Sequence, residues 1–494
     1  MSWVEIKNLQ RLSLDEISKL DFIEFRESII KEIHEGRRLV NLFGVSDNNF
    51  VRIFCILAED ELSKLYVLSS SLKQGEIFDS ISNEVPSAHL FERELHEQFG
   101  VIPNGHPWLK PVRQGIAGVN QTQKQYQFFQ MFGDEVHEVA VGPIHAGIIE
   151  PGHFRFSAHG EIVHNLEIQL GFQHRGIENL FVQNNNFLYQ TKLAESIAGD
   201  SVIAHSGTFI RGIESLMNIK ISNRVKIIRS IMLELERIAV HLGDLSAISN
   251  DIAYLTGNSI FGALRTSIIN TSMLICGNRF GRGMMKIGGI NFDIDNSKAK
   301  TILDTVNRVE NETSTAAEAM FSSASVMERL EKTGVVSQEI AQAIGMVGMA
   351  ARASGISIDA RVDHPFGAYE FFPIHKLTLD SGDVFARAYI RFVEIQQSAR
   401  IINDLMKNYS DGNLVENIGD MKKYSLVVSI TEGWRGEIVH CLITDEDGRI
   451  QKVKIKDPSF NNWFALALAV RNEGISDFPL CNKSFNLSYC GFDL

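Results

Sequence analysis

Histidines and carboxylates that can exchange protons recur between residues 142 and 205 of the sequence. His145 and His153 stand beside glycines, and the run His174-Arg175-Gly176-Ile177-Glu178 follows them. An imidazole titrates near neutral pH, and a carboxyl group can act as an acid or a base beside it. Taken alone, these patterns favour simpler interpretations. A histidine beside glycine is usually structural, and neighbouring Arg and Glu residues usually form an ion pair.

The cysteines do not form a recognisable metal or disulfide pattern. There are five, and no two of them have Cys-x-x-Cys spacing: Cys55, Cys276, Cys441, Cys481 and Cys490. Such scattered thiols are neither a disulfide framework nor a zinc site, and they fit a reducing cytoplasm.

Length and charge exclude several classes of protein. A chain of 494 residues is too long for one ordinary core and predicts two or three domains. Its 48 basic and 60 acidic residues give a net charge of −12, which argues against a nucleic-acid partner because phosphates would be repelled. No apolar stretch approaches the ~18–20 residues that cross a bilayer, and no signal peptide is expected. Contact with a membrane is therefore predicted to be indirect.

The elements that must position these residues predict an α+β multidomain fold. Residues 1–113 are typical of a small α/β domain, with helical periodicity at 14–36 and strand-like runs at 39–45, 51–57 and 65–68. A polar, glutamine-rich stretch at 114–137 is expected to be a linker. Residues 138–494 then form a second domain that is rich in helices.

In the second domain, β-branched residues over 139–171 predict a small antiparallel sheet. Apolar residues at spacings of three and four predict long amphipathic helices at 223–242, 299–324, 337–351 and 383–406. Strands are expected at 424–430, 438–444 and 453–455, with a hairpin turn at 445–448. A last helix at 462–471 leads to a tail that is expected to be irregular.

Motifs in the first domain resemble the small peripheral-arm subunit of respiratory complex I. They are Phe91-Glu92-Arg93-Glu94, Phe99-Gly100 and Gly105-His106-Pro107. Glu97 departs from that signature, which usually has an aspartate there. This motif is expected to cap a turn and dock a neighbour rather than to carry chemistry.

The second domain resembles the large subunit of the energy-converting (group 4) nickel–iron hydrogenase, formate hydrogenlyase and complex I family. The resemblance rests on the histidine motifs above, with Gly142-Pro143 and Glu150-Pro151, and on later stretches. These are Leu235-Glu236-Arg237 through Asp244, Cys276-Gly277-Asn278-Arg279, Arg352-Ala353-Ser354-Gly355, Asp359-x-Arg361, Gly436-Glu437 and Asp457-Pro458. The motifs span residues 91–494 in family order, and fusion of small and large subunits in one chain is known in the family.

The resemblance implies a nickel site built from two Cys-x-x-Cys pairs, whose thiolates are soft and can bridge two metals. The motif register places the first pair on Ala198 and Ser201, and it places the second pair on Ser488 and Gly491. Cys490 is one residue out of register. Because none of these positions carries a thiol, the chain is expected to hold no nickel.

Complex I proteins lost the same cysteines and reduce quinone with a tyrosine and a histidine. Gly199 stands at the position of that tyrosine, while His145 is retained and Asp200 could donate a proton instead. The resemblance therefore implies His145, His153, Glu178 and Asp200 as catalytic candidates. It also implies that His174 and Arg175 face an iron–sulfur cluster of a neighbouring subunit, where a positive charge would favour the reduced cluster.

Two functions remain open. The first is a subunit of a membrane-associated, ion-translocating oxidoreductase complex on the cytoplasmic face. Its expected partners are an iron–sulfur subunit, antiporter-like membrane subunits and an electron-input module. In that complex the chain would bind no cofactor of its own, and quinone is a candidate acceptor. The second function is a non-catalytic adaptor that uses the hydrogenase fold as a scaffold.

Overall fold

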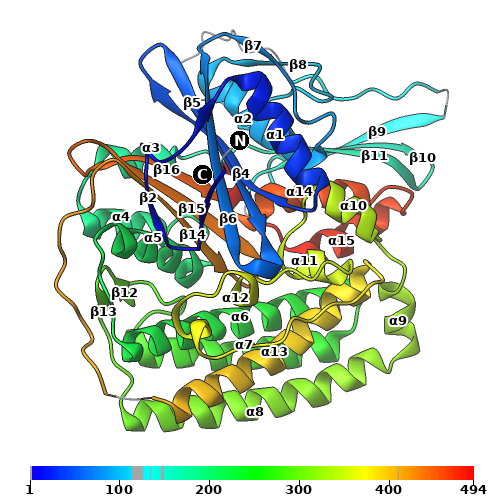
Figure 1. The fold of residues 1–494 in the computed structure, drawn as a ribbon. Helices are drawn as coiled ribbons and strands as arrows, with labels where there is room; N and C mark the ends of the chain where they lie inside the picture. Colours follow the sequence, from blue (N-terminus) through cyan, green and yellow to red (C-terminus); the bar gives the residue numbers. More distant parts are fainter. Residues whose placement is uncertain (1–2, 114–125, 134, 146–148, 410) are drawn as a thin grey trace.

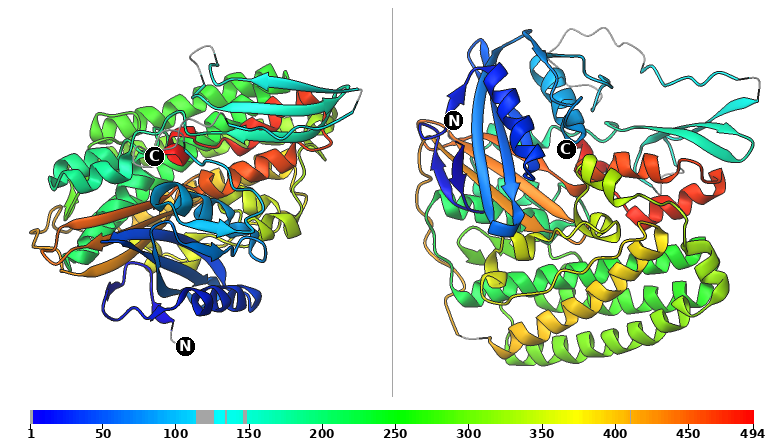
Figure 2. Two further views of the ribbon diagram at one scale, coloured as in Figure 1. Left: turned by 90° about the horizontal axis from the view of Figure 1, so that it is seen from above. Right: turned by 45° about the vertical axis from the view of Figure 1, so that its right-hand side comes forward.

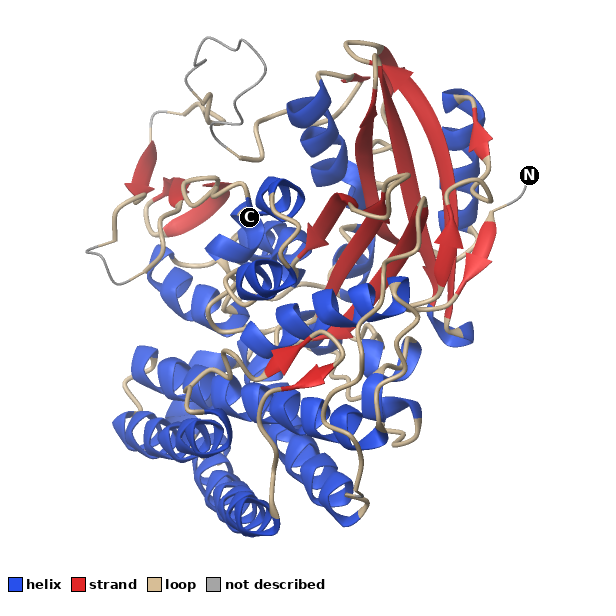
Figure 3. Cartoon of the chain, turned by 90° about the vertical axis from the view of Figure 1, so that its left-hand side faces the viewer, coloured by secondary structure: helices blue, strands red, loops and turns tan. Residues whose placement is uncertain are grey.

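The computed structural model describes residues 3–113, 126–133, 135–145, 149–409 and 411–494. Residues 114–125 and 134 of the predicted linker lie outside the described residues. Sheets with their covering helices occupy one half of the molecule, and long helices occupy the other (Figure 1). Figure 3 shows the same separation of strands and helices. The predicted α+β class is confirmed.

The N-terminal part is built on a meander of three long antiparallel strands. They are β4 (Arg38–Asp47), β5 (Phe50–Glu59) and β6 (Lys64–Lys73), and β6 also pairs with β1 (Val4–Ile6) and β3 (Lys19–Leu20). Helix α1 (Phe22–His34) begins where the Asp21 side chain accepts a hydrogen bond from Glu24 N. Helix α2 (His89–Phe99) ends at Gly100, whose φ of 70° suits glycine. The short strands β7 (Ile77–Asp79) and β8 (Ile102–Asn104) form a parallel pair.

The first residues of the chain cross into the C-terminal sheet. Strand β2 (Arg11–Ser13) pairs with β14 (Ser425–Glu432), which continues to β15 (Glu437–Thr444) and β16 (Ile450–Lys456). One apolar core then packs this sheet against β4, β5 and β6, with Phe43 and Phe54 facing Leu426 and Val428. The predicted strands at 424–430, 438–444 and 453–455 are confirmed. Both the pairing of β2 with β14 and the shared apolar core connect residues on either side of residue 113, where the sequence predicts the end of the first domain.

A small three-stranded sheet lies at one end of the molecule, as predicted. Its strands are β9 (Val136–Val141), β10 (His153–His159) and β11 (Ile162–Gln169), all antiparallel. The sheet projects beyond the helices that follow it (Figure 2). The loop between β9 and β10 carries His145.

Four long helices form the bundle. They are α6 (Asn223–Asp251), α7 (Leu255–Cys276), α8 (Asn296–Phe321) and α13 (Val384–Lys407). Three of them match predicted helices, although α6 is longer than expected. The predicted helix at 337–351 is wrong as a single element. It breaks into α10 (Gln338–Ala343) and α11 (Gly348–Ala353), because Gly345 and Gly348 have φ values of 70° and 72°, which end a right-handed helix.

Helix α7 was not predicted. Its polar face carries Ser, Thr and Asn rather than charges, and Arg265 is its one charged residue. Among the described helices it is the one that is long and apolar enough to cross a membrane, with a mean hydropathy of 1.2 over its best window. Of that window 44% is buried in the molecule, where α7 packs against α6 and α8, so a core helix accounts for it equally well.

Shorter elements complete the chain. They are α3 (Ile177–Gln183), α4 (Phe187–Ala194), α5 (Val202–Leu216), β12 (Met285–Lys286), β13 (Gly289–Ile290), α9 (Ala324–Leu330), α12 (Ala360–Asp363), α14 (Pro458–Ala469), α15 (Phe478–Phe485) and α16 (Tyr489–Asp493). The expectation of an irregular tail is wrong, since α15 and α16 are helical. Both bury apolar side chains, such as Phe485 and Phe492, and this packing stabilises short helices that sequence periodicity cannot reveal.

Candidate functional site

The C-terminal tail, residues 488–494, lies at the centre of the candidate site. All seven of its residues are buried. The Ser488 hydroxyl caps α16 by accepting a hydrogen bond from Gly491 N at 2.9 Å. The carbonyl of Leu494 accepts hydrogen bonds from the main-chain N–H groups of Arg175 (2.8 Å) and Gly176 (3.1 Å). The tail is therefore held from within the fold.

Arg435 joins Asn486, two residues before the tail, to the loop of residues 198–201. Its Nε donates to the Asn486 carbonyl at 2.6 Å, and its Nη2 lies 2.8 Å from Asp200 Oδ2. Its Nη1 lies 3.4 Å from the Ser201 hydroxyl. Because Arg435 is 2% exposed, these contacts are the electrostatic compensation for a buried cation. All four sequence-predicted ligand positions thus lie in or next to segments that one guanidinium connects, and Ser201 is the one of them that Arg435 contacts directly.

The space beside Gly491 is filled by a carboxylate. A Cβ atom at this position would lie 2.8 Å from Asp457 Oδ2 and 2.9 Å from the Ser488 hydroxyl oxygen. These separations are shorter than ordinary contacts, so a cysteine at position 491 would displace Asp457. Ala198 is fully buried. The four positions Ala198, Ser201, Ser488 and Gly491 lack thiolates, and at Gly491 the neighbouring side chain leaves no room for one.

Asp457 forms a buried line of acid–base groups with two histidines. His205 Nε2 lies 3.0 Å from Asp457 Oδ2, and His205 Nδ1 lies 3.2 Å from His440 Nε2. Burial alone would raise the pKa of Asp457, but the hydrogen bond from His205 and the charge of Arg435 outweigh it and lower the pKa to about 2. Asp457 is therefore ionised at neutral pH. It also caps α14 by accepting a hydrogen bond from Ser459 N at 2.8 Å.

Two histidines, His145 and His153 at the start of β10, connect the residues that follow β9 to those that precede β10. His145 Nε2 lies 2.8 Å from the Gly152 carbonyl, and His153 Nδ1 lies 3.0 Å from the Gly142 carbonyl. The second nitrogen of His153 is buried without a hydrogen-bond partner among the described residues. The hydrogen bonds of His145 and His153 to main-chain carbonyls fit a structural role, while the orphaned nitrogen of His153 is a buried polar atom that could bind a further group.

This loop packs directly on the C-terminal tail. Glu150 Oε2 accepts a hydrogen bond from Cys490 N at 3.3 Å. A Cβ atom on Gly152 would lie 2.5 Å from the Tyr489 ring, so the close approach requires glycine. Burial, followed by the charge of Glu150, raises the pKa of the Cys490 thiol to about 12, and the thiol stays protonated. Glu150 and Gly152 thus pack against Cys490 and Tyr489 of the tail.

His174 and Arg175 lie on the other side of the tail. His174 is half-buried, and its Nδ1 lies 2.8 Å from the Asp493 carbonyl. Arg175 is exposed, and its guanidinium donates to the carbonyls of Ser196 (2.7 Å) and Ile197 (2.9 Å). The positive charge of Arg175 therefore remains at the surface, beside the loop of residues 198–201.

Glu178 lies in a buried ion cluster. Its carboxylate is 3.0 Å from Lys452 Nζ and 3.4 Å from Lys454 Nζ, and it accepts a hydrogen bond from Ile455 N at 2.9 Å. Burial raises the pKa of Glu178, but the charges of the two lysines outweigh it and hold the pKa well below its usual range. Its hydrogen bonds and ion pairs are with β16, and they do not include the other three catalytic candidates.

The same cluster links the two halves of the chain. Lys454 also pairs with Glu94 of α2, and Glu94 pairs with Arg113. Arg113 in turn donates to the Phe492 carbonyl from Nη2 at 2.9 Å. Through Glu94, the motif Phe91–Glu94 therefore connects the N-terminal part to β16 and, by way of Arg113, to the tail of the same chain. Docking of a neighbouring subunit by this motif stays a prediction.

A cleft of about 480 Å³ opens between the N-terminal part and α3. Its walls include His174, Glu178, Lys452, Arg113 and Leu494. The structure thus brings His174 and Glu178 to one cleft, while His145, His153 and Asp200 lie around the tail. Among the described residues, no group of three or more His, Cys, Asp or Glu side chains could hold a metal ion.

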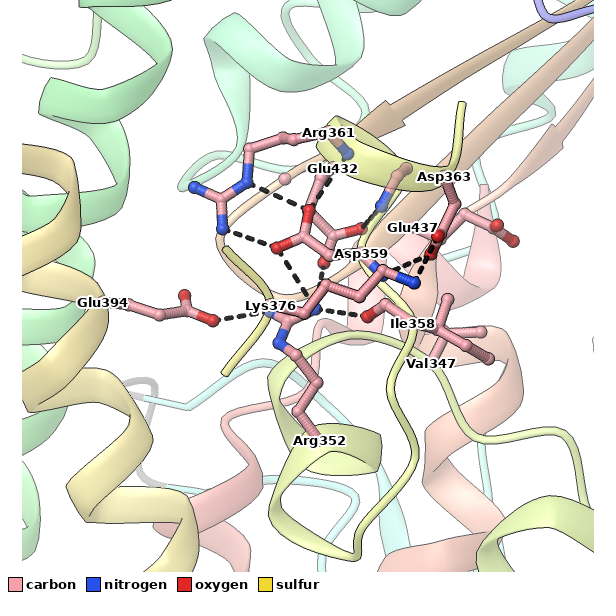
Figure 4. A network of polar contacts seen from close by, with 12 residues as sticks. Val347, Arg352, Ile358, Asp359, Arg361, Asp363, Lys376, Glu394, Glu432 and Glu437 are labelled. Carbon is pink, nitrogen blue, oxygen red and sulfur yellow. Dashed lines mark hydrogen bonds and ion pairs between the residues drawn. The ribbon is translucent and has the colours of Figure 1, made fainter. Parts of the chain in front are cut away.

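Figure 4 shows a network of ion pairs around Arg352 that reaches Glu394 and Glu432. Arg352 lies 2.6 Å from Glu394 of α13 and 2.8 Å from Glu432 of β14. Arg237 of α6 donates to the carbonyls of Glu432 (2.8 Å) and Gly433 (2.9 Å). The helix bundle therefore holds the end of β14, three residues before Arg435.

Three residues of the candidate site are not among the functional candidates that the sequence predicts. Arg435 follows Trp434 in the turn between β14 and β15, Asp457 precedes Pro458, and His205 follows Ala204. Each lies in or beside a motif that carries the family resemblance, and this position in the sequence is the one feature that could have marked it as a candidate. Their convergence depends on contacts between residues more than 200 positions apart, which sequence spacing cannot supply.

Two family models match the chain. Residues 17–114 match the 30 kDa subunit of respiratory-chain NADH dehydrogenase, and residues 251–426 match its 49 kDa subunit. Formate hydrogenlyase subunit 5 of Escherichia coli is 26% identical over 92% of this chain and 84% of its own. The chain belongs to the group 4 hydrogenase and complex I family. It is an oxidoreductase-family protein in which the two complex I-type domains are fused.

Further relatives and one solved structure show the same similarity. Hydrogenase-4 component G of Escherichia coli is 26% identical over 92% of this chain and 83% of its own. The C/D component of NADH-quinone oxidoreductase from Bacteroides thetaiotaomicron is 28% identical over 72% of this chain and 74% of its own. The fold matches a chain of an archaeal membrane-bound sulfane sulfur reductase with a TM-score of 0.68 and 20% identity, covering 74% of this chain and all of that one.

Proposed function

We propose that this chain is a subunit of a membrane-associated, ion-translocating oxidoreductase complex that relays electron-transfer events without a nickel site of its own. Its relatives are subunits of membrane-bound hydrogenases and complex I-like enzymes. Residues 1–113 act as the small-subunit-like domain and residues 138–494 as the large-subunit-like domain.

One observation carries the proposal. At Gly491 the space for a side chain is taken by Asp457, which is held by His205 and lies in the field of Arg435. A thiolate there would have to displace an ionised, hydrogen-bonded carboxylate. Ala198 and Ser201 likewise offer no soft ligand. The residues present do not fit a nickel–iron centre, and no step of the reaction runs through one.

The intact polar groups support a role in electron transfer. Arg175 is exposed with a fixed positive charge, and His174 lines the cleft beside it. We assign this surface to a partner iron–sulfur subunit, whose cluster would be stabilised in its reduced form by the cation. Around the tail, His145, His153 and Asp200 are the proton-exchanging groups, and quinone is a candidate acceptor.

The remaining partners follow from the family. We assign antiporter-like membrane subunits and an electron-input module to the complex, and we place the chain on the cytoplasmic face of the membrane. The net charge of −12 supports protein rather than nucleic-acid partners. Contact with the membrane would come through those subunits.

A second function, a non-catalytic adaptor, is favoured by a specific contact pattern. Glu178 is neutralised by Lys452 and Lys454, and Asp200 is paired with Arg435. Carboxylates in such pairs are less available for proton exchange. The adaptor would use the cleft and the tail as a scaffold alone.

The test is to purify the complex through this chain and measure its metals and its cluster. We expect no stoichiometric nickel and no hydrogen-dependent dye reduction, and one nickel per chain would overturn the proposal. Redox titration followed by electron paramagnetic resonance should give a lower cluster midpoint potential in R175M than in wild type. If the R175M complex assembles and its cluster titrates like wild type, the electron-relay function is wrong and the adaptor function replaces it.

A further inference from the structure

The C-terminal tail makes a second set of contacts that the proposed function does not use. Asp493, fully buried in α16, accepts hydrogen bonds from Gly171 N at 2.7 Å and from Gln173 N at 2.8 Å, one at each carboxylate oxygen. Its main-chain carbonyl lies 2.8 Å from His174 Nδ1. One residue therefore holds both the loop of residues 171–174 and the imidazole at its end.

The carbonyl fixes which nitrogen of His174 can titrate. A carbonyl oxygen accepts hydrogen bonds and cannot donate them, so Nδ1 must carry its proton in both charge states of the ring. The proton that comes and goes is then the one on Nε2. An imidazole without this contact could instead place its single proton on either nitrogen.

The carboxylate supplies the rigidity that makes this contact stable. Charge-assisted hydrogen bonds from two main-chain N–H groups are stronger than neutral ones, and they leave the loop little freedom. The next residues are held as well, because Arg175 N and Gly176 N donate to the Leu494 carbonyl. Burial raises the pKa of Asp493 to about 6, so its side chain is mostly ionised at neutral pH. The charged groups that face Asp493 and His174 are Arg113, Glu150 and Arg175, together with Glu178 and Lys452 across the cleft.

We propose that Asp493 is a positioning residue for His174, so that the tail presents Nε2 as the proton-exchanging nitrogen of the surface assigned to the cluster. This inference rests on the proposed function, since it gives His174 its influence on a partner's cluster. Asp493 itself does not touch the cluster or a substrate. Its effect is transmitted through the loop that it holds.

The test compares redox titrations of the intact complex at several pH values, with the midpoint potential of the cluster measured by electron paramagnetic resonance. The variants are H174Q, D493N and D493A. The control is D295N, which also removes a carboxylate that accepts a main-chain N–H, at the start of α8 and away from the site. We expect H174Q to remove most of the pH dependence and D493N and D493A to give slopes between those of H174Q and wild type. The D295N variant should titrate like wild type.

The outcomes separate the two proposals. If H174Q flattens the slope while D493N and D493A titrate like wild type, the positioning role is wrong and the proposed function stands. If H174Q itself titrates like wild type, the influence of His174 on the cluster fails, and the positioning role fails with it. An asparagine is nearly isosteric with aspartate, so a D493N complex that does not assemble would mean that the carboxylate is merely structural, and it would also count against the positioning role.

Discussion

Replacing Glu437 by glutamine should destabilise the chain strongly, because Glu437 compensates a buried lysine. Glu437 and Lys456 are both fully buried, and Glu437 Oε1 lies 2.9 Å from Lys456 Nζ. The same carboxylate receives Arg38 at 2.7 Å and 3.0 Å through two guanidinium nitrogens. Arg38 belongs to β4, so the contact also joins the N-terminal sheet to β15.

The magnitude follows from the electrostatics of the buried carboxylate. Burial would raise the pKa of Glu437, but the charges of Arg38 and Lys456 outweigh it and lower the pKa from 4.5 to about 2. A difference of that size corresponds to about 3 kcal/mol, since one pKa unit is about 1.4 kcal/mol. Breaking a buried ion pair by removing one partner costs about 3–5 kcal/mol. We therefore expect E437Q to lower the free energy of unfolding by about 3 kcal/mol.

The sign of the pH dependence follows from the same shift. The pKa of Glu437 is lower in the folded state, so its stabilisation is present above about pH 4.5 and is lost as the pH falls toward 2. The stability of E437Q should consequently fall less steeply than that of wild type across this range.

The assay is urea unfolding of the purified chain, followed by circular dichroism at neutral pH. The matched control is E5Q, which breaks the exposed pair of Glu5 and Lys64 and should leave the free energy of unfolding nearly unchanged. The double variant E437L/K456M removes both charges of the Glu437–Lys456 pair and leaves Arg38 paired with Asp60, so it should be more stable than E437Q. If E437Q unfolds like E5Q, or if the double variant is less stable than E437Q, the electrostatic reasoning is refuted.

Two further predictions concern the candidate site. Between about pH 4 and 2, D457N should lose less stability than wild type. The reason is that His205 and Arg435 lower the pKa of Asp457 from 3.8 to about 2, so its stabilising effect in wild type is lost in that pH range. Equal unfolding free energies of the two proteins across an acid titration would contradict this. G199Y should fold with a stability within about 0.5 kcal/mol of wild type, because a Cβ at Gly199 meets no atom within 4 Å; a large loss measured by thermal unfolding would show that the position is not open.

The sequence predicted those elements whose own residues decide their structure. The periodicity of α6 and α13 places Arg and Glu opposite apolar residues, and such a pattern specifies a helix without its neighbours. Helix α7 has a single charge and gave no such pattern. Strand β2 has three residues, and its partner lies more than 400 positions away, so no local signal identifies it. The tail folds because Phe485 and Phe492 find a core that the sequence does not display.

The site was predictable only where one segment carries the information. The ligand positions Ala198, Ser201, Ser488 and Gly491 follow from motif register alone, and they stay a prediction. The proximity of Asp457 to Gly491 could not follow from register, because it arises where α14 and α16 pack together. The pairing of Glu178 with lysines of β16 likewise depends on tertiary contacts.

The contacts of Arg435 explain how the fold keeps its tail without thiolate ligands. A metal held by residues of both segments would tie the loop of residues 198–201 to the tail, and removing it would leave that link open. Arg435 makes the same link by donating to the Asn486 carbonyl on one side and to Asp200 on the other. The turn that carries Arg435 is itself held in place, since Arg237 and Arg352 bind Glu432 at the end of β14. The anchored tail in turn contacts the segments that carry the two histidines, through Glu150 near His145 and through Asp493 beside His174.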